Sequence, residues 1–336
     1  MRSPDGRPVV AAILGAACIS SSAVVMQLAG SSASMTALAR CGIALPVLAL
    51  LAWLERRRDA NRLTRRGRWL ARVAGVFLAA DLIVWSHAIA DIGAGLGTVA
   101  TNLQVVIVTL LAWAVLGERP RRSLLIALPV MLGGLVLVGG LTGTGAYGSH
   151  PGPGAALGVG VAALYAVYIL MLRQATAHHG PSAGHAPSAG QASPIGHGAA
   201  SRAPVVESLF QATLGATAGS AAVGLALRDF RLGPAWPALG WLVLLALTSQ
   251  VLGWLLITTS MPRLQAWLVS ALLLVQPMGS LALSAAVLHE HPTLPQLAGV
   301  ALMLAGVLIA ASSRGRETRQ APDAPPAALE RSLSQE

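Results

Sequence analysis

The chain has 336 residues, of which 54% are hydrophobic and only 11% are charged, and its mean hydropathy is +0.66. In a soluble domain roughly a quarter of all residues are charged, so this composition excludes an exterior that faces water. The net charge of +10 would suggest a nucleic-acid partner, but the arginines stand in short runs between apolar segments, where they act as topology signals. We therefore expect an integral membrane protein whose surroundings are the lipid bilayer, with no nucleic-acid partner.

Ten apolar runs of spanning length follow one another along the chain. They cover residues 9–30, 33–54, 69–90, 93–116, 123–141, 154–175, 205–227, 236–258, 265–288 and 294–312. A bilayer core admits only helices or closed barrels, and about 20 consecutive apolar residues make one transmembrane helix. The first run follows Arg2 and Arg7 as in a secretory signal peptide, but its length is that of a full span, so we expect a retained helix. The sequence thus predicts an all-α membrane protein with ten transmembrane helices.

The arginines predict the orientation of these spans, because the chain has no lysine. With the N-terminus in the cytoplasm, 20 of the 23 arginines fall on cytoplasmic segments, Arg40 lies within a span, and only Arg228 and Arg231 fall outside. This bias predicts a multi-pass protein of the cytoplasmic membrane with both termini in the cytoplasm.

Two segments are too polar to span the membrane. Residues 176–204, rich in Gly, Ala, Pro and Ser, are expected to form a flexible cytoplasmic linker, and residues 313–336 a disordered cytoplasmic tail. The linker also holds four histidines, for which a metal site is the alternative, but their spacing is irregular and no cysteine joins them. The two cysteines, Cys18 and Cys41, lie in apolar stretches and form no metal or disulfide motif. We expect no metal and no cofactor.

The two halves of the chain repeat each other at a constant offset of 172 residues. The matches that are not leucine pair Gln104 with Gln276, Glu118 with Glu290, Pro120 with Pro292 and Gly134 with Gly306. Five helices in each copy is an odd number, so the second copy must enter the membrane with the opposite orientation, as in the inverted repeats of secondary transporters. The predicted units are a first repeat at 9–141, an external loop at 142–153, and a second repeat at 154–312 that contains the linker.

Residues 110–120 and 298–307 resemble the end of the fourth helix and the last helix of the EamA-like families of the drug/metabolite transporter superfamily. The resemblance covers nearly all of residues 9–312, and Arg40 stands where these families often have an arginine in the second helix. It implies a permease for small molecules, often an exporter of metabolites or amino acids. One departure concerns bending, because Gln276-Pro277 of the second copy corresponds to Gln104-Val105 in the first, which lacks the usual proline break.

The spans contain two charges that need a partner or a water-filled cavity, Arg40 and Asp81. Such a charge costs about 2.5–3.5 kcal/mol even on the permissive insertion scale. From a rise of 1.5 Å per residue, the depths of these two residues differ by about 3 Å, which predicts a buried ion pair that is either structural or part of a substrate or proton site. Polar and aromatic residues on shared helical faces are further candidates for the pathway, with interhelical hydrogen bonding as the alternative for each: Gln27, Trp85, Asn102, Gln104, Tyr165, Tyr168 and Gln276.

Other residues of the spans are predicted to be structural. Glu118 and Glu290 end the fourth and ninth spans, where each is expected to accept hydrogen bonds from the N-terminus of the next helix. Small residues four apart predict close helix packing, and they leave open whether the protein is a homodimer: Gly154 with Gly158, and Gly215 with Gly219.

These features favour a secondary transporter of a small-molecule substrate. The sequence has no P-loop, so we expect a gradient of protons or of the solute, not ATP, to power transport. A receptor or scaffold without transport activity is the alternative, although it would not require the two buried charges. An intramembrane enzyme is a less favoured alternative, because the sequence contains no metalloprotease or paired catalytic motif.

Overall fold

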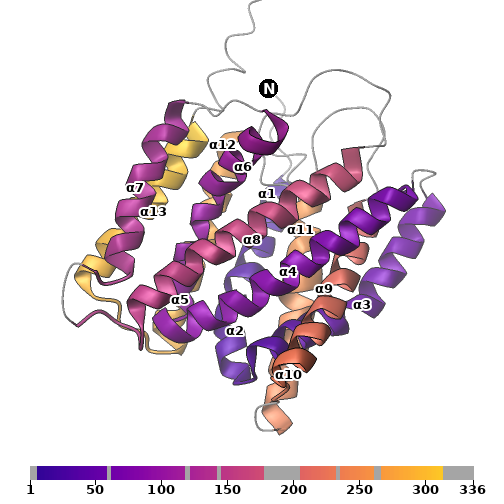
Figure 1. The fold of residues 1–336 in the computed structure, drawn as a ribbon, viewed down its shortest axis with the longest axis horizontal. Coiled ribbons are helices and arrows are strands. Elements are labelled where there is room, and N and C mark those ends of the chain that lie inside the picture. Colours follow the sequence, from indigo (N-terminus) through magenta and orange to yellow (C-terminus); the bar gives the residue numbers. More distant parts are fainter. Residues whose placement is uncertain are drawn as a thin grey trace, which may run out of the picture.

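All regular elements in the described part of the chain are helices, as the sequence predicts. The computed structural model describes residues 6–58, 62–117, 122–141, 145–177, 205–231, 235–260 and 266–312. The helices pack into one bundle in which α4 and α8 run side by side, while α7 and α13 form a separate pair at one edge (Figure 1).

The helices of the first half follow the predicted spans. They are α1 Gly6–Ser20, α2 Ser22–Ala29, α3 Ala33–Arg58, α4 Arg65–Ile92, α5 Ala94–Ala100, the 3₁₀ helix η1 Thr101–Leu103, α6 Gln104–Leu116 and α7 Arg122–Val138. The first span is interrupted at Ser21, where three successive serine hydroxyls donate to backbone carbonyls of the preceding turn. Such side-chain bonds compete with the regular hydrogen-bond ladder of a helix.

The second half contains a π-helix that the sequence did not predict. Its helices are α8 Pro151–Ala177, α9 Val205–Leu227, α10 Ala235–Leu245, the π-helix η2 Ala246–Gly253, α11 Trp254–Ser260, α12 Ala266–Val287 and α13 Leu294–Ser312. The sequence left open whether the two copies bend alike, and they differ: α12 is one helix that includes Pro277, whereas the corresponding part of the first copy is interrupted by η1. In η1 the hydroxyl of Thr101 and the amide of Asn102 both donate to the carbonyl of Thr98, which explains a break without proline.

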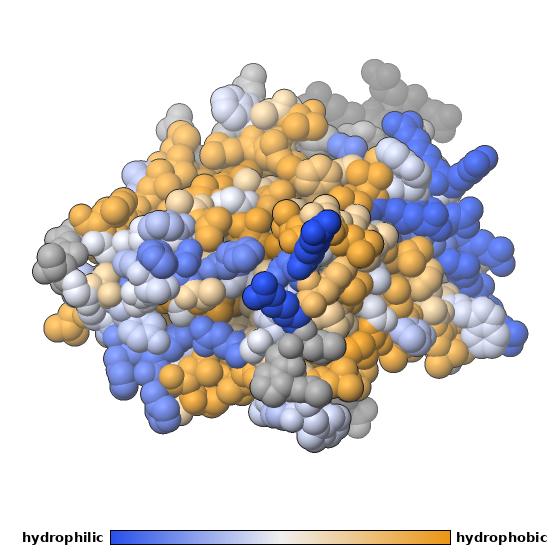
Figure 2. Space-filling view, turned by 60° about the horizontal axis from the view of Figure 1, so that its bottom comes forward, coloured by the Kyte–Doolittle hydropathy of each residue, from blue (hydrophilic) through white to orange (hydrophobic). Residues whose placement is uncertain are grey.

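The exterior of the bundle suits a lipid environment. Seven helical stretches of the described chain are long and apolar enough to cross a bilayer, and three shorter apolar helices accompany them, at Ser123–Val138, Leu274–Val287 and Leu294–Ala310. Hydrophobic residues cover much of the face in Figure 2, and many of the most hydrophilic ones gather at its right margin, on the side where α3 ends and α4 begins in Figure 1. The chain is thus a multi-pass membrane protein, and a total of ten spans stays a prediction.

Some predicted connections lie outside the described residues. These are most of the linker, the tail from residue 313, and residues 142–144 of the external loop. Glu118 also falls outside this part of the chain. Where the structure resumes, residues 151–153 of the expected loop and residues 176 and 177 of the expected linker belong to α8.

The contact between α7 and α13 has the reciprocity of a local twofold axis. A Cβ placed on Gly134 would stand 2.7 Å from Cγ of Met303, and one placed on Gly306 would collide with Met131. Both the glycines and the methionines are separated by 172 residues, so each copy contributes the same two groups to the contact. The helices run antiparallel, since the contacts pair rising numbers in α7 with falling numbers in α13. The inverted relation of the complete halves stays a prediction that this contact supports.

The predicted pairs of small residues do bring helices into close contact. A Cβ on Gly215 of α9 would collide with the backbone carbonyl of Arg72 on α4. A Cβ on Gly158 of α8 would stand 2.7 Å from the Cβ of Ala100. Both pairs therefore pack helices of the same chain, as small residues do where backbones approach each other in membranes.

Candidate functional site

Three predicted residues gather in the core that α3, α4 and η2 enclose. Arg40 on α3, and Asp81 and Trp85 on α4, are each less than 9% exposed. Asp81 and Trp85 are four residues apart and therefore share a helical face. Cζ of Arg40 lies 6.0 Å from the centroid of the Trp85 ring. The structure thus places a cation, a carboxylate and an indole in one buried cluster, which we call the Arg40 cluster.

Arg40 is held by the π-helix instead of by the carboxylate. Its Nε donates to Oε1 of Gln250 at 3.0 Å, and its Nη2 donates to Oγ of Ser249 at 3.2 Å. The direct ion pair predicted for Arg40 and Asp81 is wrong, since these two described residues lie beyond ion-pair distance. The guanidinium N–H groups that were predicted to bind the carboxylate of Asp81 instead bind neutral oxygens of η2. π-helical turns frequently occur at functional sites.

Three polar atoms of the Arg40 cluster are buried without a hydrogen-bond partner in the described part of the chain. They are Nη1 of Arg40, Oδ1 of Asp81 and Nε1 of Trp85. A buried polar group left unpaired typically costs about 1–3 kcal/mol, and more if it is charged. Such groups are rare in folded proteins and call for an explanation such as a ligand or ion. The cluster therefore offers two donors and one acceptor that the fold itself does not use.

Two tyrosines of α8 supply an aromatic wall in the same core. The ring centroids of Tyr165 and Tyr168 lie 5.7 Å apart with the planes tilted by 57°. Both rings pack against the apolar cluster that contains Trp85, and Tyr168 is almost fully buried. Ligand sites for organic molecules commonly combine such aromatic surface with a few polar groups.

The remaining predicted pathway residues do not join the Arg40 cluster. The amide of Asn102 donates to the carbonyls of Thr98 and Val99 and so serves its own helix. The other three are half-buried, and no hydrogen bond in the described chain connects them to the cluster: Gln27 in α2, Gln104 at the start of α6 and Gln276 in α12.

The sequence reasoning missed the two partners of Arg40. Ser249 and Gln250 are both at most 2% exposed and lie in the middle of an apolar run. Two adjacent polar residues at that depth are the signal that would have found them, because an intramembrane polar group is expected to have a buried partner.

Glu290 has a structural role of the predicted kind but a different partner. Its carboxylate accepts hydrogen bonds from the backbone N–H groups of Ala94 at 2.6 Å and Gly95 at 3.1 Å, which begin α5. The predicted partner, the next helix in the chain, is therefore wrong. Gly93 makes the observed contact possible, because its φ of 89° turns the chain and a Cβ there would stand 2.7 Å from Oε1 of Glu290. In the nearby loop, burial raises the pKa of the Tyr147 phenol, and the negative charge of Glu290 raises that pKa further.

Glu290→Ala is expected to destabilise the protein by about 1–3 kcal/mol, because two buried N–H groups lose their acceptor. Thermal unfolding of the purified protein in detergent measures the change as a lower Tm. The control is His291→Ala at the neighbouring exposed position, which should keep the wild-type Tm. Equal stability of the Glu290→Ala and wild-type proteins would contradict the capping role.

Comparison with known proteins links the chain to one family. The sequence model of the EamA-like transporter family matches residues 6–140 and again residues 186–312. The two matches confirm a two-copy organisation, and α8 lies between them. No curated protein matches the chain in sequence. Twenty-six chains of solved structures match, and one of them, titled "Crystal structure of protein", has a TM-score of 0.55 and 17% identity over 93% of this chain and 99% of that chain. At this identity the likeness concerns the fold alone.

Proposed function

The chain belongs to the EamA-like transporter family and is a membrane transporter of the drug/metabolite transporter superfamily, and from this premise we propose that it is a secondary permease. Its proposed activity is the export of small organic metabolites or amino-acid-like solutes across the cytoplasmic membrane. The observation that carries the proposal is the Arg40 cluster, where buried polar atoms in a membrane core have no partner in the described chain. Intramembrane ionisable residues commonly mark substrate or ion pathways.

The chemistry of the cluster fits a solute with both polar and apolar parts. The free guanidinium N–H of Arg40 suits an anionic oxygen, as in a carboxylate. The carboxylate oxygen of Asp81 suits an ammonium or hydroxyl group, or a proton that couples export to a proton gradient. The aromatic rings of Trp85 and the two tyrosines supply apolar surface for a carbon skeleton.

Arg40 also connects the two halves of the chain, which supports alternating access as the mechanism. Its hydrogen bonds run from α3 in the first half to η2 in the second. A solute oxygen that competes for the guanidinium would weaken this connection and favour a different arrangement of the halves, because a ligand shifts a conformational equilibrium through differential contacts. Rocking of two inverted repeats about a central site is a recurrent transport mechanism.

Solute flux in sealed vesicles tests this function. Purified protein is reconstituted into liposomes loaded with a mixture of amino acids and polar metabolites, and released solutes are identified by mass spectrometry with and without an imposed proton gradient. We expect saturable release of a subset of the mixture. Binding without release would favour the receptor alternative, and chemical conversion of a solute would favour an enzyme.

The proposed orientation places both termini in the cytoplasm. Reporter domains fused after Arg58 and after Arg202 are expected to read cytoplasmic, and one fused after Tyr147 external, since 20 of the 23 arginines then lie inside. An external signal from the fusion after Arg202 would contradict this topology.

A further inference from the structure

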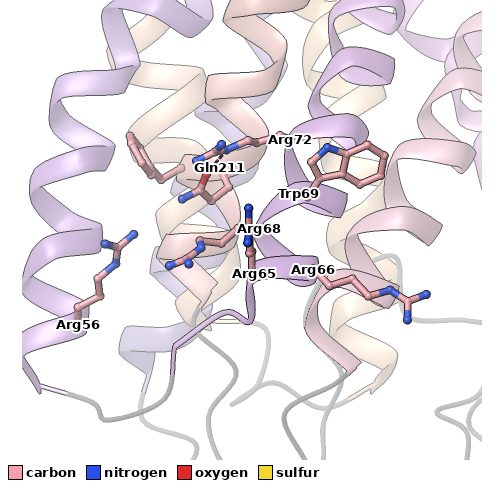
Figure 3. A pocket seen from close by; sticks show the side chains of 8 residues that line it. Arg56, Arg65, Arg66, Arg68, Trp69, Arg72 and Gln211 are labelled. Atoms are coloured by element: carbon pink, nitrogen blue, oxygen red, sulfur yellow. Dashed lines mark hydrogen bonds between the residues drawn. The ribbon is translucent and has the colours of Figure 1, made fainter.

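A pocket lined largely by arginines lies where α3 ends and where α4 and α9 begin. Its volume is about 950 Å³, and its lining consists of Arg56, Arg65, Arg66, Arg68, Trp69, Arg72, Phe210 and Gln211. In Figure 3 the side chains of Arg65, Arg68 and Arg72 follow one flank of α4 toward Gln211, and Arg66 and Trp69 extend along its other flank. The spacing explains the shared flank, because helical residues three and four apart are neighbours.

The carboxylates beside this pocket leave most of its positive charge uncompensated. One oxygen of Glu207 accepts from Arg56 at 3.0 Å, and the other accepts from the backbone N–H of Leu63 at 3.2 Å. The carboxylate of Glu55 accepts from the N–H groups of Val206 and Glu207 and so caps α9.

The arginines of α4 thus retain donors for a ligand. Arg72 donates to the neutral Gln211 at 2.7 Å. Arg65, Arg66 and Arg68 have no ion pair or hydrogen bond from their side chains within the described chain. The positive end of the α4 dipole, which starts at Arg65, adds to the same potential.

Exposed apolar residues place the pocket at the level where lipid headgroups meet hydrocarbon. Trp69 in the pocket is 62% exposed, and Trp53 on α3 is 46% exposed with the guanidinium of Arg57 stacked 3.6 Å above its ring. Tryptophans gather at both membrane interfaces. Further along the same helices, Leu50 and Val76 are exposed and continue an apolar surface away from the arginines.

We propose that this pocket binds the phosphate headgroup of an anionic phospholipid. Arginine forks match phosphate oxygens in geometry and charge, and basic pockets between membrane helices are known lipid headgroup sites. The positive-inside rule requires arginines only somewhere on the connection, whereas here Arg65, Arg68 and Arg72 share one flank of α4 and line one pocket together with Gln211 of α9 (Figure 3). Free phosphate shares the headgroup chemistry, but it has no acyl chains to contact the exposed apolar surface that continues from the pocket.

Lipid-dependent stability tests the proposal on the full-length protein. Tm is measured in detergent after addition of phosphatidylglycerol, phosphatidylcholine or inorganic phosphate, and retained phosphatidylglycerol is counted by native mass spectrometry. The pocket variant is Arg65→Gln with Arg68→Gln. The matched control is Arg228→Gln with Arg231→Gln, which removes the same charge at exposed positions between α9 and α10.

We expect phosphatidylglycerol to raise Tm and to remain bound in the wild-type and control proteins. The pocket variant should bind it roughly 30-fold more weakly, since each arginine near the surface contributes about 1 kcal/mol to anionic lipid binding. Equal binding by the pocket variant and the control overturns the proposal. Equal stabilisation by inorganic phosphate overturns the lipid as the source of the headgroup. Arg65→Gln alone, at an exposed position, gives a variant whose Tm without lipid checks that the fold is intact.

Discussion

Asp81→Asn is expected to reduce solute flux in proteoliposomes by more than tenfold while the protein still folds. The amide keeps the shape of the side chain but removes the negative charge proposed to meet the solute or a proton. Because Oδ1 of Asp81 has no hydrogen-bond partner in the described chain, the substitution breaks no hydrogen bond of that oxygen, and Arg40 keeps its bonds to Ser249 and Gln250. Loss of a charge-assisted contact costs about 1.5–3 kcal/mol, which corresponds to roughly one to two orders of magnitude in binding or rate.

Arg40→Gln is expected to affect folding as well as flux. This substitution breaks the bonds to Ser249 and Gln250 and leaves Asp81 as an uncompensated charge in the core. Each buried hydrogen-bonding group that loses its partner typically costs about 1–3 kcal/mol, and more if a charged group is involved. The double variant, Arg40→Gln with Asp81→Asn, should recover part of that stability yet remain inactive.

The matched control for Asp81 lies ten residues further along the same helix. Asp91→Asn changes a carboxylate that is 24% exposed and whose Oδ1 lies 3.5 Å from Nδ1 of His150, and it should leave flux unchanged. Unfolding in detergent separates stability from transport in each variant. If Asp81→Asn transports at the wild-type rate, the Arg40 cluster is structural and the substrate site lies elsewhere.

Helix positions could be predicted from the sequence because the bilayer fixes how long an apolar run must be. The predicted span at 205–227 coincides with α9. The reciprocal contact of α7 with α13 was not predicted, but it joins residues that the constant offset of 172 had already paired or would pair. Local breaks were harder to predict. The break at η1 depends on the side chains of Thr101 and Asn102 bonding to a backbone carbonyl, and η2 is a π-helix that no apolar pattern distinguishes from an α-helix.

Of the residues predicted for the pathway, the structure brings Arg40, Asp81 and Trp85 together, but the hydrogen-bond partners of Arg40 were not predicted. The rise per residue predicted that Arg40 and Asp81 lie at similar depths in the membrane. Depth alone does not determine in which direction a side chain points around its helix. The observed partners of Arg40 come from a helix about 210 residues further along the chain. The sequence did not indicate the arginine pocket, because the positive-inside rule by itself accounts for arginines on this connection.

Gly134→Leu is expected to disrupt packing between α7 and α13, whereas Gly133→Leu should be tolerated. A Cβ on Gly134 would stand 2.6 Å from the backbone carbonyl oxygen of Gly299 and 2.7 Å from Met303, while one on Gly133 meets nothing within 4 Å. Overpacking usually costs about 1–3 kcal/mol and more when backbone must move. The neighbouring substitution adds the same side chain to the same helix without that collision, so it controls for hydrophobicity and helix propensity.

Folded yield by size-exclusion chromatography and Tm in detergent measure both variants. Because Gly306 faces Met131 in the mirror position, Gly306→Leu should reproduce the defect of Gly134→Leu. Wild-type behaviour of both variants would contradict the reciprocal contact and with it the strongest structural support for inverted repeats.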